Sequence, residues 1–87
     1  MTEETMTEHD FPADIVFKAI LRNTSSFTMD TIKSILAERE LRALVSSIES
    51  SNGTFTSYTI SARFPSNDCL MTVCANISSL DGFMTLF

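Results

Sequence analysis

A short polar stretch, residues 22–26, combines one guanidinium with several hydroxyls and precedes a predicted helix. The free N–H groups at a helix N-terminus favour a negatively charged group. The stretch therefore predicts a site for a small anionic ligand. The alternative, which the residues leave open, is that the hydroxyls only cap the helix and the arginine is solvated. The predicted ligand-binding residues are Arg22, Asn23, Thr24, Ser25 and Ser26.

Catalytic and metal chemistry have few suitable residues. His9 is the single histidine and lies among the first ten residues, so no serine has a histidine base at a known spacing. Cys69 and Cys74 point in different directions on a predicted helix, which fits neither a disulfide nor a zinc site. We therefore expect no enzyme activity, no metal and no cofactor.

Negative charge is concentrated at the start of the chain. The net charge is −5, and Glu3, Glu4, Glu8 and Asp10 carry most of it. We expect an acidic flexible tail over residues 1–10 and a single domain over residues 11–87. That domain is nearly neutral and has no basic stripe for a phosphate backbone, so we expect no nucleic acid partner.

The polar, acidic first residues are not typical of a signal peptide, and no apolar run is long enough to span a bilayer. We expect a cytoplasmic protein without membrane contact.

Two runs rich in strand-forming residues meet at Asn52-Gly53, and the other elements are expected to pack around them. Asn-Gly between such runs predicts a hairpin with a type I′ turn, in which both central residues have positive φ. Alternation in the second run predicts one buried and one solvated face. The buried face would carry Tyr58, Ile60, Ala62 and Phe64, and the solvated face Phe55, Ser57, Thr59 and Ser61.

Four further elements flank the hairpin. Apolar residues 14–21 predict a central strand, and residues 82–87 a short last strand. Helices are predicted over residues 28–39, with Ser26 or Thr28 as N-cap and Phe27 on the apolar stripe, and over 67–78, with Ser66 as N-cap. With right-handed crossovers, this order predicts an α+β, ferredoxin-like βαββαβ sandwich. Such a sandwich is a four-stranded antiparallel sheet with two helices on one face.

The other face of this sheet would be uncovered. It could dock a partner protein or a second copy of the chain to form a homodimer, or it could be solvated with scattered apolar side chains. The predicted interaction residues on this face are Val16, Lys18, Ile20, Phe55 and Ser57.

Two motifs resemble those of the YbeD-like family, small bacterial proteins of unknown function sometimes labelled lipoate regulatory proteins. Phe11-Pro12 followed by Phe17-Lys18 is similar to the family's opening FP…(F/Y)K strand, and residues 51–57 (SNGTFTS) to its S-x-G-x-(Y/F)-x-S hairpin. The resemblance covers about residues 11–87. It implies a fold close to the ACT regulatory domain and a role in allosteric regulation, tied to lipoate or glycine-cleavage metabolism. The chain departs from the family at Leu21, where a glycine is often found.

These inferences leave three hypotheses. In the first, the chain is a regulatory or adaptor domain that acts by binding another protein. In the second, it is an ACT-like domain that senses a small molecule at the loop of residues 22–26 or in a groove between two copies of the chain. In the third, it binds RNA on the open sheet face, although Phe55 as the single aromatic there argues against stacking on bases.

Overall fold

Six elements follow one another in the order that the sequence predicts. The computed structural model describes residues 11–87, so the predicted acidic tail lies outside the described residues. No helix in the described part is long and apolar enough to cross a bilayer. The elements are β1 (Ala13–Arg22), α1 (Thr28–Glu38), β2 (Ala43–Glu49), β3 (Phe55–Phe64), α2 (Asn67–Ser78) and β4 (Phe83–Leu86).

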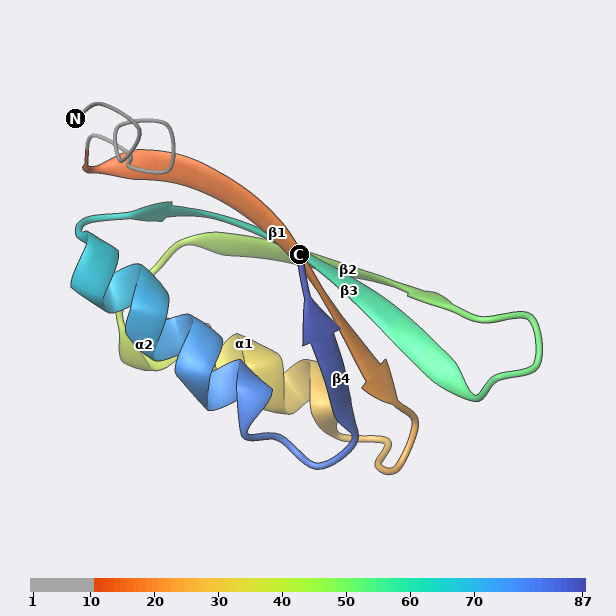
Figure 1. Ribbon diagram of the computed structural model, residues 1–87. Coiled ribbons are helices and arrows are strands. Elements are labelled where there is room, and N and C mark those ends of the chain that lie inside the picture. Colours follow the sequence, from red (N-terminus) through yellow and green to blue (C-terminus); the bar gives the residue numbers. More distant parts are fainter. Residues whose placement is uncertain (1–10) are drawn as a thin grey trace, which may run out of the picture.

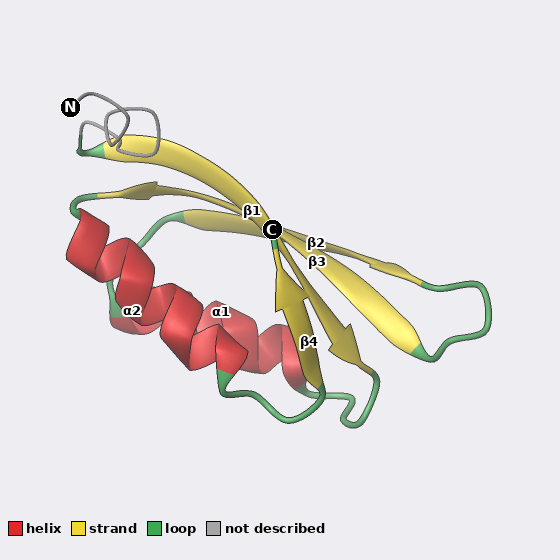
Figure 2. Cartoon of the chain, in the orientation of Figure 1, coloured by secondary structure: helices red, strands yellow, loops and turns green. Residues whose placement is uncertain are grey.

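The four strands form one antiparallel sheet in the order β2-β3-β1-β4. The two central strands, β1 and β3, pair over their full length, from Ala13 opposite Phe64 to Arg22 opposite Phe55. Both helices pack on the same side of the sheet, as Figures 1 and 2 show. This is the α+β, ferredoxin-like sandwich, and the predicted fold class is confirmed.

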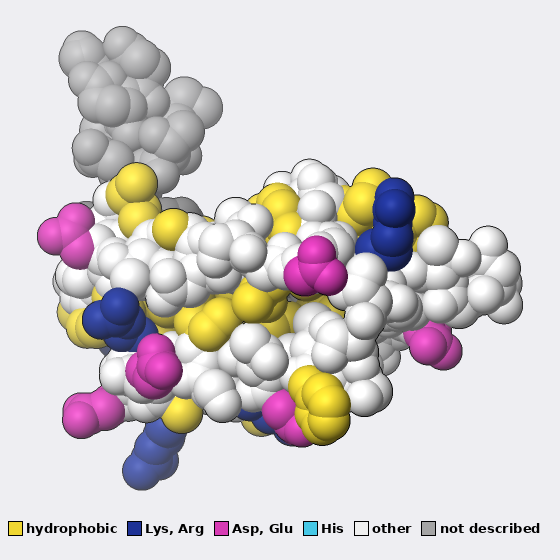
Figure 3. All heavy atoms as spheres, turned by 90° about the horizontal axis from the view of Figure 1, so that it is seen from below, with side chains coloured by type: hydrophobic (Ala, Val, Ile, Leu, Met, Phe, Trp, Pro, Cys, Tyr) yellow, Lys and Arg dark blue, Asp and Glu magenta, His cyan; other side chains and the backbone are white. Residues whose placement is uncertain are grey.

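Alternation along the central strands gives the sheet a covered face and an open face. The covered face meets the apolar stripes of the two helices, and burial of each large aliphatic or phenylalanine side chain there contributes roughly 1.5–3 kcal/mol to folding. From the helix side, charges of both signs are scattered and hydrophobic side chains show along the middle (Figure 3). The buried apolar residues are Ala19, Leu21, Ile32, Leu36, Tyr58, Ile60, Ala62, Phe64, Val73 and Ile77.

The two helices begin differently. Ser66 caps α2 as predicted, because its hydroxyl accepts a hydrogen bond from the Cys69 N–H at 3.1 Å. The N-cap of α1 is Phe27, with no side-chain cap, so the predicted cap at Ser26 or Thr28 is wrong. Phe27 is also 67% exposed rather than part of the apolar stripe, because it precedes the helix and its periodicity.

The hairpin loop differs from the predicted turn. Five residues separate β2 from β3, and Gly53 has φ +74° whereas Asn52 is not in the left-handed region, so the turn is not type I′. Asn52 acts through its side chain instead. Its Oδ1 accepts hydrogen bonds from the Ser50 hydroxyl (2.9 Å) and the Thr54 N–H (3.1 Å), which satisfies the loop locally.

Helix α1 ends in a Schellman motif with a non-glycine residue in the left-handed conformation. Glu40 has φ +58°, and its N–H donates to the Ala37 carbonyl at 2.9 Å. The next N–H, that of Leu41, donates to the Leu36 carbonyl at 3.2 Å. This tight turn connects α1 to the edge strand β2.

Candidate functional site

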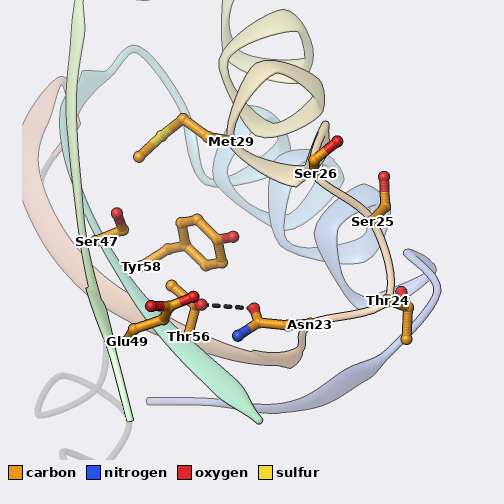
Figure 4. A pocket seen from close by; sticks show the side chains of 9 residues that line it. All are labelled: Asn23, Thr24, Ser25, Ser26, Met29, Ser47, Glu49, Thr56 and Tyr58. Atoms are coloured by element: carbon orange, nitrogen blue, oxygen red, sulfur yellow. Dashed lines mark hydrogen bonds between the residues drawn. The ribbon is translucent and has the colours of Figure 1, made fainter. Parts of the chain in front are cut away.

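A groove of about 690 Å³ lies between the β1–α1 loop and the end of the β2–β3 hairpin. In Figure 1 this hairpin extends past the ends of both helices, which leaves part of the covered sheet face without a helix over it. One wall is formed by residues 23–26 and by Met29 in the first turn of α1, and the other by side chains of β2 and β3 (Figure 4). The strand residues are Ser47, Glu49, Thr56 and Tyr58.

Asn23 links the β1–α1 loop to the β2–β3 hairpin through hydrogen bonds. Its backbone N–H donates to the Thr54 carbonyl at 2.8 Å, and its Nδ2 donates to the Gly53 carbonyl at 2.8 Å. Its Oδ1 accepts a hydrogen bond from the Thr56 hydroxyl at 2.5 Å. Three hydrogen bonds at one residue therefore hold the two walls of the groove at a defined separation.

The Tyr58 hydroxyl has no hydrogen-bond partner in residues 11–87. The side chain is only 6% exposed, and no hydrogen bond to its hydroxyl is found in the described part of the chain. Every fully enclosed side-chain oxygen or nitrogen in residues 11–87 has a hydrogen-bond partner. Since the Tyr58 hydroxyl has none, it is not fully enclosed and opens onto the groove that Tyr58 lines. Figure 4 shows it directed across the groove toward the Ser26 side of the loop. A largely buried tyrosine usually has a hydrogen-bond partner for its hydroxyl.

The charge of the groove is negative, because Glu49 is the one ionised side chain among its lining residues. Arg22, the predicted anion ligand, does not line it. It is the last residue of β1 rather than the first of the loop, and strand alternation directs it to the open face after buried Leu21. There its guanidinium lies 5.9 Å from the centre of the Phe55 ring, a cation–π contact.

The groove's side chains suit hydrogen bonding to a small polar molecule. Hydroxyls can donate or accept, and the Glu49 carboxylate can only accept. No group of three or more histidine, cysteine, aspartate or glutamate side chains in residues 11–87 is arranged to hold a metal ion.

Four of the five predicted ligand residues thus meet in one groove, but five other lining residues escaped the sequence analysis. They are Met29, Ser47, Glu49, Thr56 and Tyr58. A length comparison could have found the groove. Ten residues of β3 span about 33 Å, whereas the eleven of α1 span about 17 Å. A helix of that length cannot cover the whole strand.

The predicted interaction residues all lie on the open face of the sheet. Val16 is opposite Ser61, Lys18 is opposite Thr59, and Ile20 is opposite Ser57. Val16 is 65% exposed, whereas Ile20 is half-buried.

Two further apolar side chains on the open face were missing from the prediction. Leu44 and Ile48 of β2 are 78% and 75% exposed. They are opposite Ser61 and Ser57, so the pairing of the hairpin strands puts them beside the predicted residues.

The two cysteines are free thiols on α2. Partial burial raises the pKa of the Cys74 thiol above its ordinary value. Neither cysteine lines the groove.

Comparisons with known proteins agree with this architecture. The family model described as "Protein of unknown function (DUF493)" matches residues 6–86. The solution structure of protein HP0495 from H. pylori is similar in fold, with a TM-score of 0.75 and 17% sequence identity over 92% of this chain and 86% of that one. No curated protein matches the chain. The resemblance to the YbeD-like proteins is confirmed, since that family and DUF493 are the same. The chain therefore belongs to the DUF493 family of proteins of unknown function.

Proposed function

We propose that the protein is a non-enzymatic regulatory domain that binds a small polar ligand in the groove between residues 23–26 and the β2–β3 hairpin. One observation carries the proposal: the hydroxyl of the largely buried Tyr58 has no hydrogen-bond partner among residues 11–87, and it opens onto the groove. A ligand that bonds to it would take the place of water at a hydroxyl that has no partner among residues 11–87.

The ligand class follows from the charge of the lining. Glu49 is a hydrogen-bond acceptor with a negative charge, and no lysine or arginine lines the groove to offset it. An anion would be repelled, whereas an amine or a neutral molecule rich in hydroxyls would find acceptors and donors. We therefore propose an amine or a polyol in place of the small anion that the sequence predicts.

An amide NMR titration of labelled protein tests this proposal. Separate pools of primary amines, polyols and small carboxylates serve as probes. We expect shifts at residues 23–29 and 47–58 with the amine or polyol pool and none with the carboxylates. Shifts elsewhere, or shifts with carboxylates alone, would contradict it.

Two substitutions separate binding from folding. Tyr58→Phe removes a hydroxyl that makes no hydrogen bond within the described chain, so the free energy of unfolding should change by less than about 0.5 kcal/mol while ligand binding weakens. Glu49→Gln should weaken the binding of an amine, whereas Glu38→Gln, at the end of α1 and outside the groove, should not.

A second candidate function is protein binding at the open sheet face, favoured by the exposure of Val16, Leu44 and Ile48. Apolar residues scattered singly are common on protein surfaces, whereas apolar residues grouped on one face mark interaction sites, and Val16 and Leu44 lie on either side of Ser61. Replacing Leu44 and Ile48 by serine should abolish any self-association measured by light scattering. If the protein is monomeric at all accessible concentrations, the open face does not form a homodimer.

A further inference from the structure

A second groove lies at the opposite end of the strands from the one already described. It has a volume of about 480 Å³ and is bounded by the start of β1, the α1–β2 turn and the end of β3. Its lining residues are Pro12, Arg39, Glu40, Leu41, Arg42, Arg63 and Pro65.

Positive charge is concentrated there. Residues 11–87 contain six basic and seven acidic side chains, and this groove takes three of the bases and only one of the acids. The rest of the domain is consequently acidic. This segregation gives the two grooves opposite signs, since the first is lined by one carboxylate and no base.

The guanidinium groups are mostly available to a ligand. Arg63 forms an ion pair with Asp14 at 3.3 Å, but both side chains are well exposed, and such pairs are weak. Within the part of the chain that the structure describes, Arg39 and Arg42 have no carboxylate within ion-pair distance, although Glu40 lies between them in sequence.

We propose that this groove binds an acidic segment of a partner protein, with aspartate or glutamate carboxylates on the three arginines. A guanidinium binds a carboxylate through two parallel hydrogen bonds, and clustered arginines are a recurring way to recognise acidic motifs. Pro12, Leu41 and Pro65 supply apolar walls between the charges. That mixture suits a peptide, whose carboxylates are separated by backbone and apolar side chains, better than one compact phosphate.

A labelled oligoglutamate peptide, titrated into the full chain at low salt and followed by fluorescence anisotropy, tests the proposal. We expect saturable binding that weakens as the ionic strength rises, because the charges are exposed. Arg39→Gln and Arg42→Gln should each reduce affinity about two- to five-fold, in the range measured for exposed ion pairs. Lys33→Gln, a matched loss of one charge on α1 outside this groove, should leave the affinity unchanged.

Three results would overturn the proposal. The first is an absence of oligoglutamate binding at low salt. The second is an equal loss of affinity in Lys33→Gln and in the arginine variants, which would mean that only net charge matters. The third is tighter binding of inorganic phosphate or an oligoribonucleotide with the same dependence on Arg39 and Arg42. That result would assign the groove to phosphate groups.

Discussion

Replacement of Asn23 by alanine should destabilise the protein by an amount that the hydrogen bonds of its side chain define. The side chain donates to the Gly53 carbonyl and accepts from the Thr56 hydroxyl. The first bond is exposed and should contribute about 0.5–1 kcal/mol. The second bond comes from the hydroxyl of Thr56, which is 7% exposed, so loss of this bond also leaves a largely buried hydroxyl without a partner. The expected total is about 2 kcal/mol.

The pair can be isolated with a double-mutant cycle. Thr56→Val removes the hydroxyl and leaves the Asn23 oxygen free to bind water, so it should cost about 1 kcal/mol. Once Asn23 is alanine, the same change removes an unsatisfied group and should cost little. The coupling free energy between Asn23 and Thr56 is therefore expected to be about 1 kcal/mol.

Urea denaturation followed by far-ultraviolet circular dichroism gives these free energies, and a thermal scan gives a second readout. For a domain of this size, each kcal/mol should lower Tm by about 4–8 °C. Asn76→Ala on α2 is the matched control, because the Asn76 side chain makes no hydrogen bond in the described part, and it should not destabilise the protein, since alanine favours a helix over asparagine by up to about 0.7 kcal/mol. Additive effects of the Asn23 and Thr56 substitutions would show that the hydrogen bond between the two side chains contributes nothing to stability.

Three further predictions concern single positions. Glu40→Gly should stabilise the protein by about 1 kcal/mol in urea denaturation, because glycine adopts the left-handed conformation at φ +58° without steric cost; an unchanged midpoint would contradict the argument. Gly82→Ala should destabilise it by at least about 2 kcal/mol, since φ is +85° and the new Cβ would lie 2.7 Å from the Arg22 carbonyl oxygen; wild-type stability would show that the turn can relax. Because the raised pKa of Cys74 makes the folded state hold the thiol proton more tightly, stability should fall as pH rises above about 9. Cys74→Ala should flatten that part of the pH profile in urea midpoints measured across it, and an identical slope in both proteins would exclude the thiol as the cause.

The fold could be predicted because its signals are local and agree with one another. Alternation from Phe55 to Phe64 determines which face of β3 is buried, and the Ser66 cap with its following stripe determines where α2 starts. These patterns repeat over many residues, so an error at one position changes little.

The site was only partly predictable, because it depends on single residues and on distances between elements. One additional strand residue in β1 turns Arg22 to the opposite face of the sheet, away from the loop to which it was assigned. The Asn-Gly pair predicts a two-residue turn, but in the structure the Asn52 side chain accepts two hydrogen bonds within a longer loop, and the pair alone does not distinguish these cases. The arginine-lined groove is formed by residues 39–42 together with residues 63–65, and no local sequence pattern indicates that these segments lie close together.

The full-length pairing of β1 with β3 has a consequence for the order in which the chain can fold. Ala13 pairs with Phe64, so the first strand cannot complete its ladder until residues through Phe64 have been synthesised. Until then Ile15 and Phe17 lack the strand and most of the core that later cover them. The β2–β3 hairpin, by contrast, closes through a short loop and can form early. On the ribosome, β1 should therefore add to an existing hairpin, and the nascent chain is most prone to aggregate before that step.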